Sequence, residues 1–308
     1  MFSQRKKELN NSNKAELSGD EQMPEQQDEH IIEASGRARI VIRNGKVVKV
    51  GDPLIRDCPL AKRFAYPIPE MTKEHIAANI THRIQAFGMC TPDREVEDKR
   101  EFVGFGASEI ISFGMRAGML DAAVIACDGA GTVIAPTPSL VQGIGGRMSG
   151  LVSTTPYQSV IRRIEAAGGI VVYPETGSMD QVGGTSRAVG EGFSRIAVTV
   201  ALPQDAEAIR GLYPNVLIIA VHTTGLTVDE AKTLVGAADL VTACASGSMR
   251  EIAGAAALVQ AGVSVPVFAI TEKGKEIIIE KIHQSDEPVL IKPTKLPVGG
   301  GTQPEPLI

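Results

Sequence analysis

Five apolar runs in this chain end in residues that could carry out chemistry or bind a ligand. They are AAVIA (122–126) before Cys127 and Asp128, RIAVTVA (195–201) with Thr199, VLIIAV (216–221) before His222, Thr223 and Thr224, LVTACA (240–245) with Cys244, and VPVFAI (265–270) before Thr271. Apolar, β-branched runs without polar alternation are typical of strands that are buried on both faces of a parallel sheet. Because ligands bind at the carboxyl ends of such strands, we expect these side chains to form one site.

His222 is the strongest candidate for catalysis. A histidine at the carboxyl end of a strand suits general acid–base chemistry or metal ligation, and the hydroxyls of Thr223 and Thr224 could bind a ligand. The alternative is a histidine that orients its own loop through one hydrogen bond. We favour catalysis because the threonines and Gly225 make a polar, open turn.

Asp128 follows Cys127 directly and could act as a general base or bind a ligand hydroxyl. The neighbouring carboxylate raises the pKa of a thiol, so Cys127 is a poor nucleophile without a compensating cation. The alternative is a small buried residue followed by an aspartate in a turn.

Cys244 joins a strand to the start of a predicted helix, where the helix dipole stabilises a thiolate. It is therefore a candidate nucleophile or metal ligand, although cysteines at strand ends are also often buried and inert. Cys90 precedes a second predicted helix start at 91–93. Cys90, Cys127 and Cys244 could together hold an iron–sulfur cluster or a zinc ion.

The glycine-rich segment 142–150 is a candidate anion-binding loop. Successive glycines allow backbone N–H groups to converge on an anion, while an arginine and a serine add a charge and a hydroxyl. The segment lacks the Lys-Ser/Thr pair of a Walker A loop. The alternative is a tight loop that packs against the sheet. The candidate ligand-binding residues in it are Gly143, Gly145, Gly146, Arg147 and Ser149.

The elements that must position these residues alternate along the chain as strands and helices from residue 121 onward. Strands are centred on Ala123, Ile170, Ile196, Leu217, Leu240 and Val267, and amphipathic helices are predicted at 157–167, 181–191, 204–212, 228–235, 248–260 and 273–283. Six strands are too few for an eightfold barrel. We therefore predict an α/β fold with an open, doubly wound, mostly parallel sheet.

The rest of the chain divides by composition. Residues 1–29 are polar and predict a disordered tail. Residues 30–70 form a small β unit with a hairpin at Asn44-Gly45, and residues 71–120 form a helical segment in which Thr72 is the N-cap of a helix over 72–87. The α/β domain covers 121–296, and the Pro/Gly-rich segment 297–308 predicts a flexible tail.

Charge and composition exclude several classes of protein. The net charge is −5, aromatic residues make up 4% of the chain and tryptophan is absent, which argues against nucleic-acid binding. No apolar run approaches the length of a membrane span, and residues 1–30 do not resemble a signal peptide. We therefore expect a cytoplasmic protein with reduced thiols that forms a homo-oligomer.

Several strings resemble the methanogenesis marker protein 8 family, a domain of unknown function, in order from His30 to Lys275. They are IRNGKVVKVGDPLIRDCPL, FGMCTPDR, FGASEI, CDGAGTVI, VQGIGGRMSGLVSTTP, IAVTVA, AVHTTG and VTACAS. The resemblance implies a context of archaeal C1 metabolism without an established reaction. Many members of that family carry Cys-Glu-Gly-Cys where this chain has Cys127-Asp128-Gly129-Ala130, so a four-cysteine cluster would lack one sulfur here.

Three functions are consistent with these patterns. The leading hypothesis is an enzyme or cofactor-assembly factor for a small anionic ligand, in which Arg147 and the nearby glycines hold the anion. His222 and Asp128 would then transfer protons, and Cys244 would supply a thiolate. The alternatives are a metal or iron–sulfur protein and a non-catalytic accessory protein of a methanogenesis enzyme complex.

Overall fold

The computed structural model describes residues 28–148, 150–300 and 302–308, so most of the predicted disordered tail lies outside the described residues. The first part of the fold is a four-stranded sheet with the order β3-β2-β1-β6. Its strands are β1 (His30–Ala34), β2 (Ala38–Arg43), β3 (Lys46–Val50) and β6 (Leu151–Thr154). The predicted hairpin at Asn44-Gly45 is confirmed, because Arg43 pairs with Lys46 across this turn.

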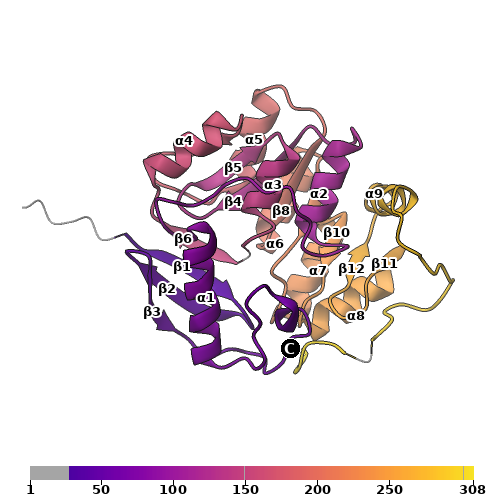
Figure 1. The fold of residues 1–308 in the computed structure, drawn as a ribbon. Coiled ribbons are helices and arrows are strands. Elements are labelled where there is room, and N and C mark those ends of the chain that lie inside the picture. Colours follow the sequence, from indigo (N-terminus) through magenta and orange to yellow (C-terminus); the bar gives the residue numbers. More distant parts are fainter. Residues whose placement is uncertain (1–27, 149, 301) are drawn as a thin grey trace, which may run out of the picture.

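The small sheet and α1 (Lys73–Phe87) enclose a core of their own (Figure 1). Isoleucines of β1 and β2 pack there against Ile76 and Ile80 of α1, and the short helix η1 (Ala61–Arg63) contributes Ala61. Thr72 caps α1 as predicted. The predicted helix start at 91–93 is wrong: Thr91 and Asp93 form a tight turn through hydrogen bonds to the Gly88 carbonyl and the Thr91 hydroxyl, and the chain then runs on without regular structure.

An eight-stranded sheet forms the second and larger part, with the order β11-β12-β10-β9-β8-β4-β5-β7. Its strands are β4 (Ala122–Cys127), β5 (Gly131–Ala135), β7 (Ile170–Val171), β8 (Ile196–Val200), β9 (Leu217–Ala220), β10 (Leu240–Thr242), β11 (Val259–Ala261) and β12 (Val267–Ala269). All strands except β5 and β12 point in one direction, so the mostly parallel sheet is confirmed.

Helices cover both faces of this sheet. One face packs against α2 (Ala107–Arg116), α3 (Pro138–Ile144), α4 (Gln158–Ala166) and α9 (Glu272–His283). The opposite face packs against α5 (Gln181–Gly190), α6 (Pro203–Leu212), α7 (Val228–Ala237) and α8 (Gly247–Ala256). Five of the six helices predicted in this part are confirmed. The sixth, predicted over 248–260, ends at Ala256, and residues 259–261 form β11, a strand that the sequence did not predict. Helix α3 was not predicted, and it contains the start of the glycine-rich segment.

The small sheet lies against the carboxyl ends of the central strands. The Gly129 N–H, just after β4, donates to the Thr154 hydroxyl of β6 (2.7 Å). The loop after β9 contacts β1 through His222 and Glu33. Strand β6 comes from the long interval between β5 and β7, which is why the sequence did not assign it to the predicted β unit.

The segment 302–308 returns to the same junction. Glu305 pairs with Asp57, and the Ile308 N–H donates to the Ala245 carbonyl (2.7 Å). The Gly247 N–H donates in turn to Ile308 (2.8 Å). The flexible tail predicted for 297–308 stays a prediction, and these backbone hydrogen bonds place residues 302–308 beside α8.

Within the described residues, no helix combines the length and the apolar character that crossing a membrane requires.

Substitution of two helix glycines by alanine should change the stability of the protein in opposite directions. Gly184 lies where α5 packs on the sheet, and a Cβ there would be 2.5 Å from Thr132 Cγ2 and 2.8 Å from Val124 Cγ1. Gly236 of α7 has open space in place of a Cβ. We expect Gly184→Ala to lower the free energy of unfolding by about 1–3 kcal/mol and Gly236→Ala to raise it by about 0.5–1 kcal/mol. Denaturant unfolding checks both, and equal effects would contradict this packing of α5.

Candidate functional site

His222 lies just beyond the carboxyl end of β9 and is bonded to the small sheet. Its Nε2 is 3.0 Å from Oε2 of Glu33, and the two side chains are 17% and 20% exposed. His222 has a left-handed backbone conformation, with a φ of +57°. That conformation is unfavourable for a non-glycine residue, and such strain clusters at functional sites. The position therefore joins a reactive side chain to a strained backbone.

Glu33 accepts hydrogen bonds from two side chains at this junction. It accepts from His222 and from Nε of Arg37 (3.0 Å). Burial alone would raise the pKa of the Glu33 carboxyl, but the hydrogen bonds from His222 and Arg37, with the charge of Arg37, lower it below its usual value. Arg37 also donates to the Thr224 carbonyl. Glu33 is therefore an anion at neutral pH that holds both side chains in place.

Gly150 brings the end of the glycine-rich segment to His222. Its φ is +72°, and a Cβ would overlap the Glu33 carbonyl and lie 2.7 Å from Cε1 of His222. The Glu33 N–H donates to the Gly150 carbonyl (2.7 Å). The carboxyl-terminal end of the predicted anion-binding segment, at Gly150, therefore lies next to the predicted catalytic histidine. Ser149 lies outside the described residues.

The other predicted ligand-binding residues of this segment face the protein. Gly143 packs against the backbone of Val96, Gly145 lies against Ser108 and Gly146 against the Gln142 carbonyl. Arg147 donates to Asp98 (2.6 and 3.1 Å) and to Glu95 (2.9 Å), and its side chain is 8% exposed. Anion binding by these four residues stays a prediction, and their contacts in this structure are those of a packed turn.

Thr223 and Thr224 hold neighbouring strand ends together. The Thr223 hydroxyl donates to the Thr242 carbonyl (2.6 Å), and Thr242 donates to the Ala220 carbonyl (3.1 Å). The Thr224 hydroxyl accepts from the Ala245 N–H (3.3 Å). The two threonines thus fix the loop that carries His222.

Asp128 forms a completely buried ion pair with Arg94. The Arg94 Nε lies 2.9 and 3.1 Å from the two carboxylate oxygens, and both side chains are 0% exposed. Asp128 also accepts from the Cys90 N–H (2.6 Å). The other N–H groups of Arg94 donate hydrogen bonds to backbone carbonyls, which include those of Gly143 (3.0 Å) and Ile144 (3.4 Å). The predicted general base is therefore held away from solvent.

A second buried network surrounds His30. Its Nδ1 lies 2.6 Å from the Thr154 hydroxyl and its Nε2 2.9 Å from the Tyr157 hydroxyl. Burial lowers the pKa of His30, although the charges of Asp128 and Asp28 oppose this shift. Tyr157 donates to Asp28 and lies 3.5 Å from the Cys90 carbonyl. His30 belongs to the same strand as Glu33, so β1 supplies a side chain to both networks.

The four cysteines occupy two separate places. Burial and the charge of Asp128 raise the pKa of Cys90 and of Cys127. Burial raises the pKa of Cys244 to about 11, so the expected thiolate is a protonated thiol at neutral pH. Cys244 lies close enough to Cys58 for a charge there to raise its pKa further. The described residues contain no group of three or more metal-ligating side chains, so Cys90, Cys127 and Cys244 are not brought together.

Sequence reasoning did not identify the side chains of His30, Glu33, Arg37, Arg94 and Tyr157 as members of these networks. Two signals point to these residues. His30 and Ile32 are alternate residues of a half-buried strand, which places the imidazole on the inner face. Arg94 ends the string FGMCTPDR, which carries part of the family resemblance.

The fold and the site define an α/β protein in which a second, small sheet covers the carboxyl edge of the large one and carries a carboxylate to His222. A family model described as "Uncharacterized protein conserved in archaea (DUF2099)" matches residues 30–283, and the chain belongs to this family. An uncharacterized protein of Methanocaldococcus jannaschii is 42% identical over 284 residues, which cover 91% of this chain and 100% of that protein. Neither description carries the methanogenesis marker name. The matched residues include Arg94, Asp128, His30 and His222.

The buried ion pair predicts a large loss of stability when one partner is removed. Arg94→Met leaves the Asp128 carboxylate buried without its cation, which costs about 3–5 kcal/mol. The control is Arg187→Met, which removes an arginine paired with Glu191 on the surface of α5, where both side chains are well exposed. Chemical denaturation compares the two variants, and we expect a much smaller change for the control. Equal losses would show that the buried pair is not a major constraint.

The lowered pKa of His30 leads us to expect a loss of stability in mild acid. Because its pKa in the fold lies below 6.5, the unfolded chain binds a proton more readily as the pH falls below that value. The free energy of unfolding should therefore decrease from pH 6.5 toward about pH 5.5, above the range in which the glutamates of the unfolded chain titrate. His30→Gln should flatten this slope, whereas replacing the exposed His75 should not. An unchanged slope in His30→Gln would contradict the prediction.

Proposed function

We propose that this protein is an enzyme that acts on a small anionic ligand at the carboxyl edge of the large sheet, with His222 as the proton-transferring residue. The observation that carries the proposal is the hydrogen bond between His222 and Glu33, made by a histidine with a strained backbone at the end of a parallel strand. Ligands of open α/β sheets bind at this edge, so the position agrees with the chemistry.

The arrangement is that of a general base oriented by a carboxylate. Glu33 is anionic and accepts a hydrogen bond from Nε2–H of His222, which leaves the lone pair of the neutral imidazole on Nδ1. Among the residues that the structure describes, no group forms a hydrogen bond with Nδ1. His222 can then take a proton at Nδ1 while Glu33 stabilises the imidazolium that forms.

Arg37 takes the anion-binding role in this proposal in place of Arg147. Arg147 is paired with two carboxylates, those of Asp98 and Glu95, and is 8% exposed. Arg37 is 27% exposed and has one carboxylate partner, Glu33, which it shares with His222. The backbone around Gly150 completes the site next to His222. Asp128 and Cys244 have no part in proton transfer here, because the first is buried in an ion pair and the second is a protonated thiol.

The metabolic context is a separate proposal that rests on the resemblance of the strings FGMCTPDR, VQGIGGRMSGLVSTTP and AVHTTG to methanogenesis marker protein 8. We propose that the ligand is an intermediate of archaeal C1 metabolism or of the assembly of one of its cofactors. The archaeal family description is compatible with this context.

Conversion of a metabolite tests the enzyme. Purified protein is incubated with the small-molecule fraction of a methanogen extract, and compounds consumed or formed are followed by mass spectrometry. We expect one compound to be converted by the wild type, with conversion slowed at least about 100-fold in His222→Asn and at least about 10-fold in Glu33→Gln. The control is His283→Asn, an exposed histidine at the end of α9 with a side chain that is 78% exposed.

Thermal unfolding of each variant distinguishes catalysis by His222 from a purely structural role, in which its hydrogen bond to Glu33 acts only as a clamp that holds the two sheets together. A clamp would lower the melting temperature of His222→Asn and leave conversion per folded molecule unchanged. That result, or an extract in which the wild type converts nothing, would overturn the proposal.

A further inference from the structure

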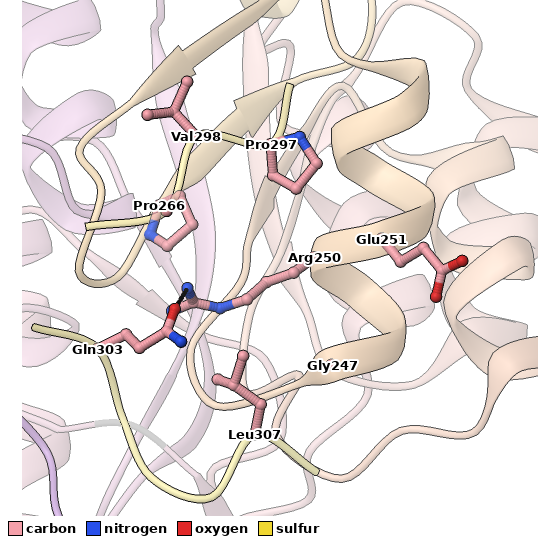
Figure 2. Close-up of a pocket in the computed structure, with 9 residues that line it drawn as sticks. Gly247, Arg250, Glu251, Pro266, Pro297, Val298, Gln303 and Leu307 are labelled. Carbon is pink, nitrogen blue, oxygen red and sulfur yellow. Dashed lines mark hydrogen bonds between the residues drawn. The ribbon is translucent and has the colours of Figure 1, made fainter. Parts of the chain in front are cut away.

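Beside α8, away from the loop that carries His222, the protein has a cavity of about 360 Å³. One wall is α8 with Gly247 and Arg250, and another comes from residues 297–299 together with Gln303 and Leu307 (Figure 2). Most of the lining is apolar, contributed by Pro266, Pro297, Val298 and Leu307. The volume lies in the range of small-molecule sites in proteins.

Arg250 is the cation of this cavity, and it is 6% exposed. Its guanidinium donates to the carbonyls of Cys244 (2.9 and 3.1 Å) and Ser264 (2.6 Å) and to Oε1 of Gln303 (3.1 Å). These acceptors are neutral. Among the described residues, no carboxylate lies within ion-pair distance of Arg250, and Glu251, the next residue of α8, points away from it in Figure 2.

A buried guanidinium without a counter-charge is costly, because hydrogen bonds to carbonyls satisfy its N–H groups without neutralising its charge. Burial accordingly lowers the pKa of Arg250. Arg94 shows the contrast, since that fully buried arginine has the carboxylate of Asp128 as its counter-charge. One N–H of Nη1 has no acceptor among the described residues, on the same nitrogen that donates to Gln303.

We propose that this cavity binds a small carboxylate with an apolar body, whose carboxylate pairs with Arg250 and whose hydrocarbon part lies against the prolines, Val298 and Leu307. The guanidinium matches a carboxylate in both charge and hydrogen-bond geometry. Gln303 holds the position next to Nη1 and lies on the segment that closes the cavity. The site differs from that of His222, so neither proposal depends on the other.

Titration with hexanoate tests the site. Isothermal titration calorimetry of the full chain should show one saturable site, and 1-hexanol, the neutral analogue of the same length, should bind at least about tenfold more weakly. Arg250→Met should weaken hexanoate binding at least about tenfold, and Arg162→Met, an exposed arginine of α4, should bind as the wild type does. Equal binding of hexanoate and hexanol, or no saturable binding to the wild type, would overturn the proposal.

Gln303→Glu gives a second test that does not remove Arg250. A carboxylate attached to the chain beside Nη1 would take the place of the ligand. We expect a higher melting temperature and a loss of hexanoate binding of at least about tenfold. A melting temperature that is unchanged or lower, together with undiminished hexanoate binding, would show that Arg250 has no need of an anion.

Discussion

The buried ion pair of Arg94 and Asp128 is the interaction on which the junction of the two sheets depends. It connects three segments that are far apart in the sequence: the turn after α1, the carboxyl end of β4 and, through the Arg94 guanidinium, the last carbonyls of α3. Charges that are 0% exposed cannot exchange their partner for water, so separation of these segments leaves an unpaired charge in an apolar surrounding. The Cys90 N–H also donates a hydrogen bond to the Asp128 carboxylate. Cys90 has a left-handed backbone conformation in the turn that makes this contact.

Strand β1 lies across this junction and gives the small sheet its role in the site. His30 points to the network around Asp128 and Tyr157, and Glu33 reaches His222 at the end of β9. The large sheet alone would present His222 on an open loop, as many α/β sheets do with their catalytic residues. The small sheet adds the carboxylate that orients the imidazole and removes most of its contact with solvent. The site is thus shared between two sheets, although each sheet has a core of its own.

Local patterns predicted the elements well and the partners of the side chains poorly. The apolar runs placed the strands around Ile196, Leu217 and Leu240, and the helices between them followed from amphipathic spacing. The same patterns could not show that Arg94 reaches Asp128 or that Glu33 reaches His222, because these contacts join segments separated by 34 and 189 residues. For Arg147 the sequence predicted a ligand-binding role because the carboxylates that contact it could not be foreseen. Its place in a glycine-rich segment suggested a free cation, and Asp98 and Glu95, which neutralise it, lie 49 and 52 residues earlier. Cys244 was judged from the helix dipole, whereas burial determines its protonation.

The position of β6 has a consequence for the order in which this chain can fold. β1, β2 and β3 are adjacent in sequence and can pair as soon as they leave the ribosome, but β1 remains an open edge until β6 arrives, and His30 pairs with Thr154, 124 residues later. An exposed edge strand is a site for wrong pairing with other chains. Closing so long a loop costs entropy and is slow, so the small sheet is completed only after residues 151–154 have been synthesised. The bridge between Asp57 and Glu305 closes a longer loop still and forms only after residue 305 has been synthesised.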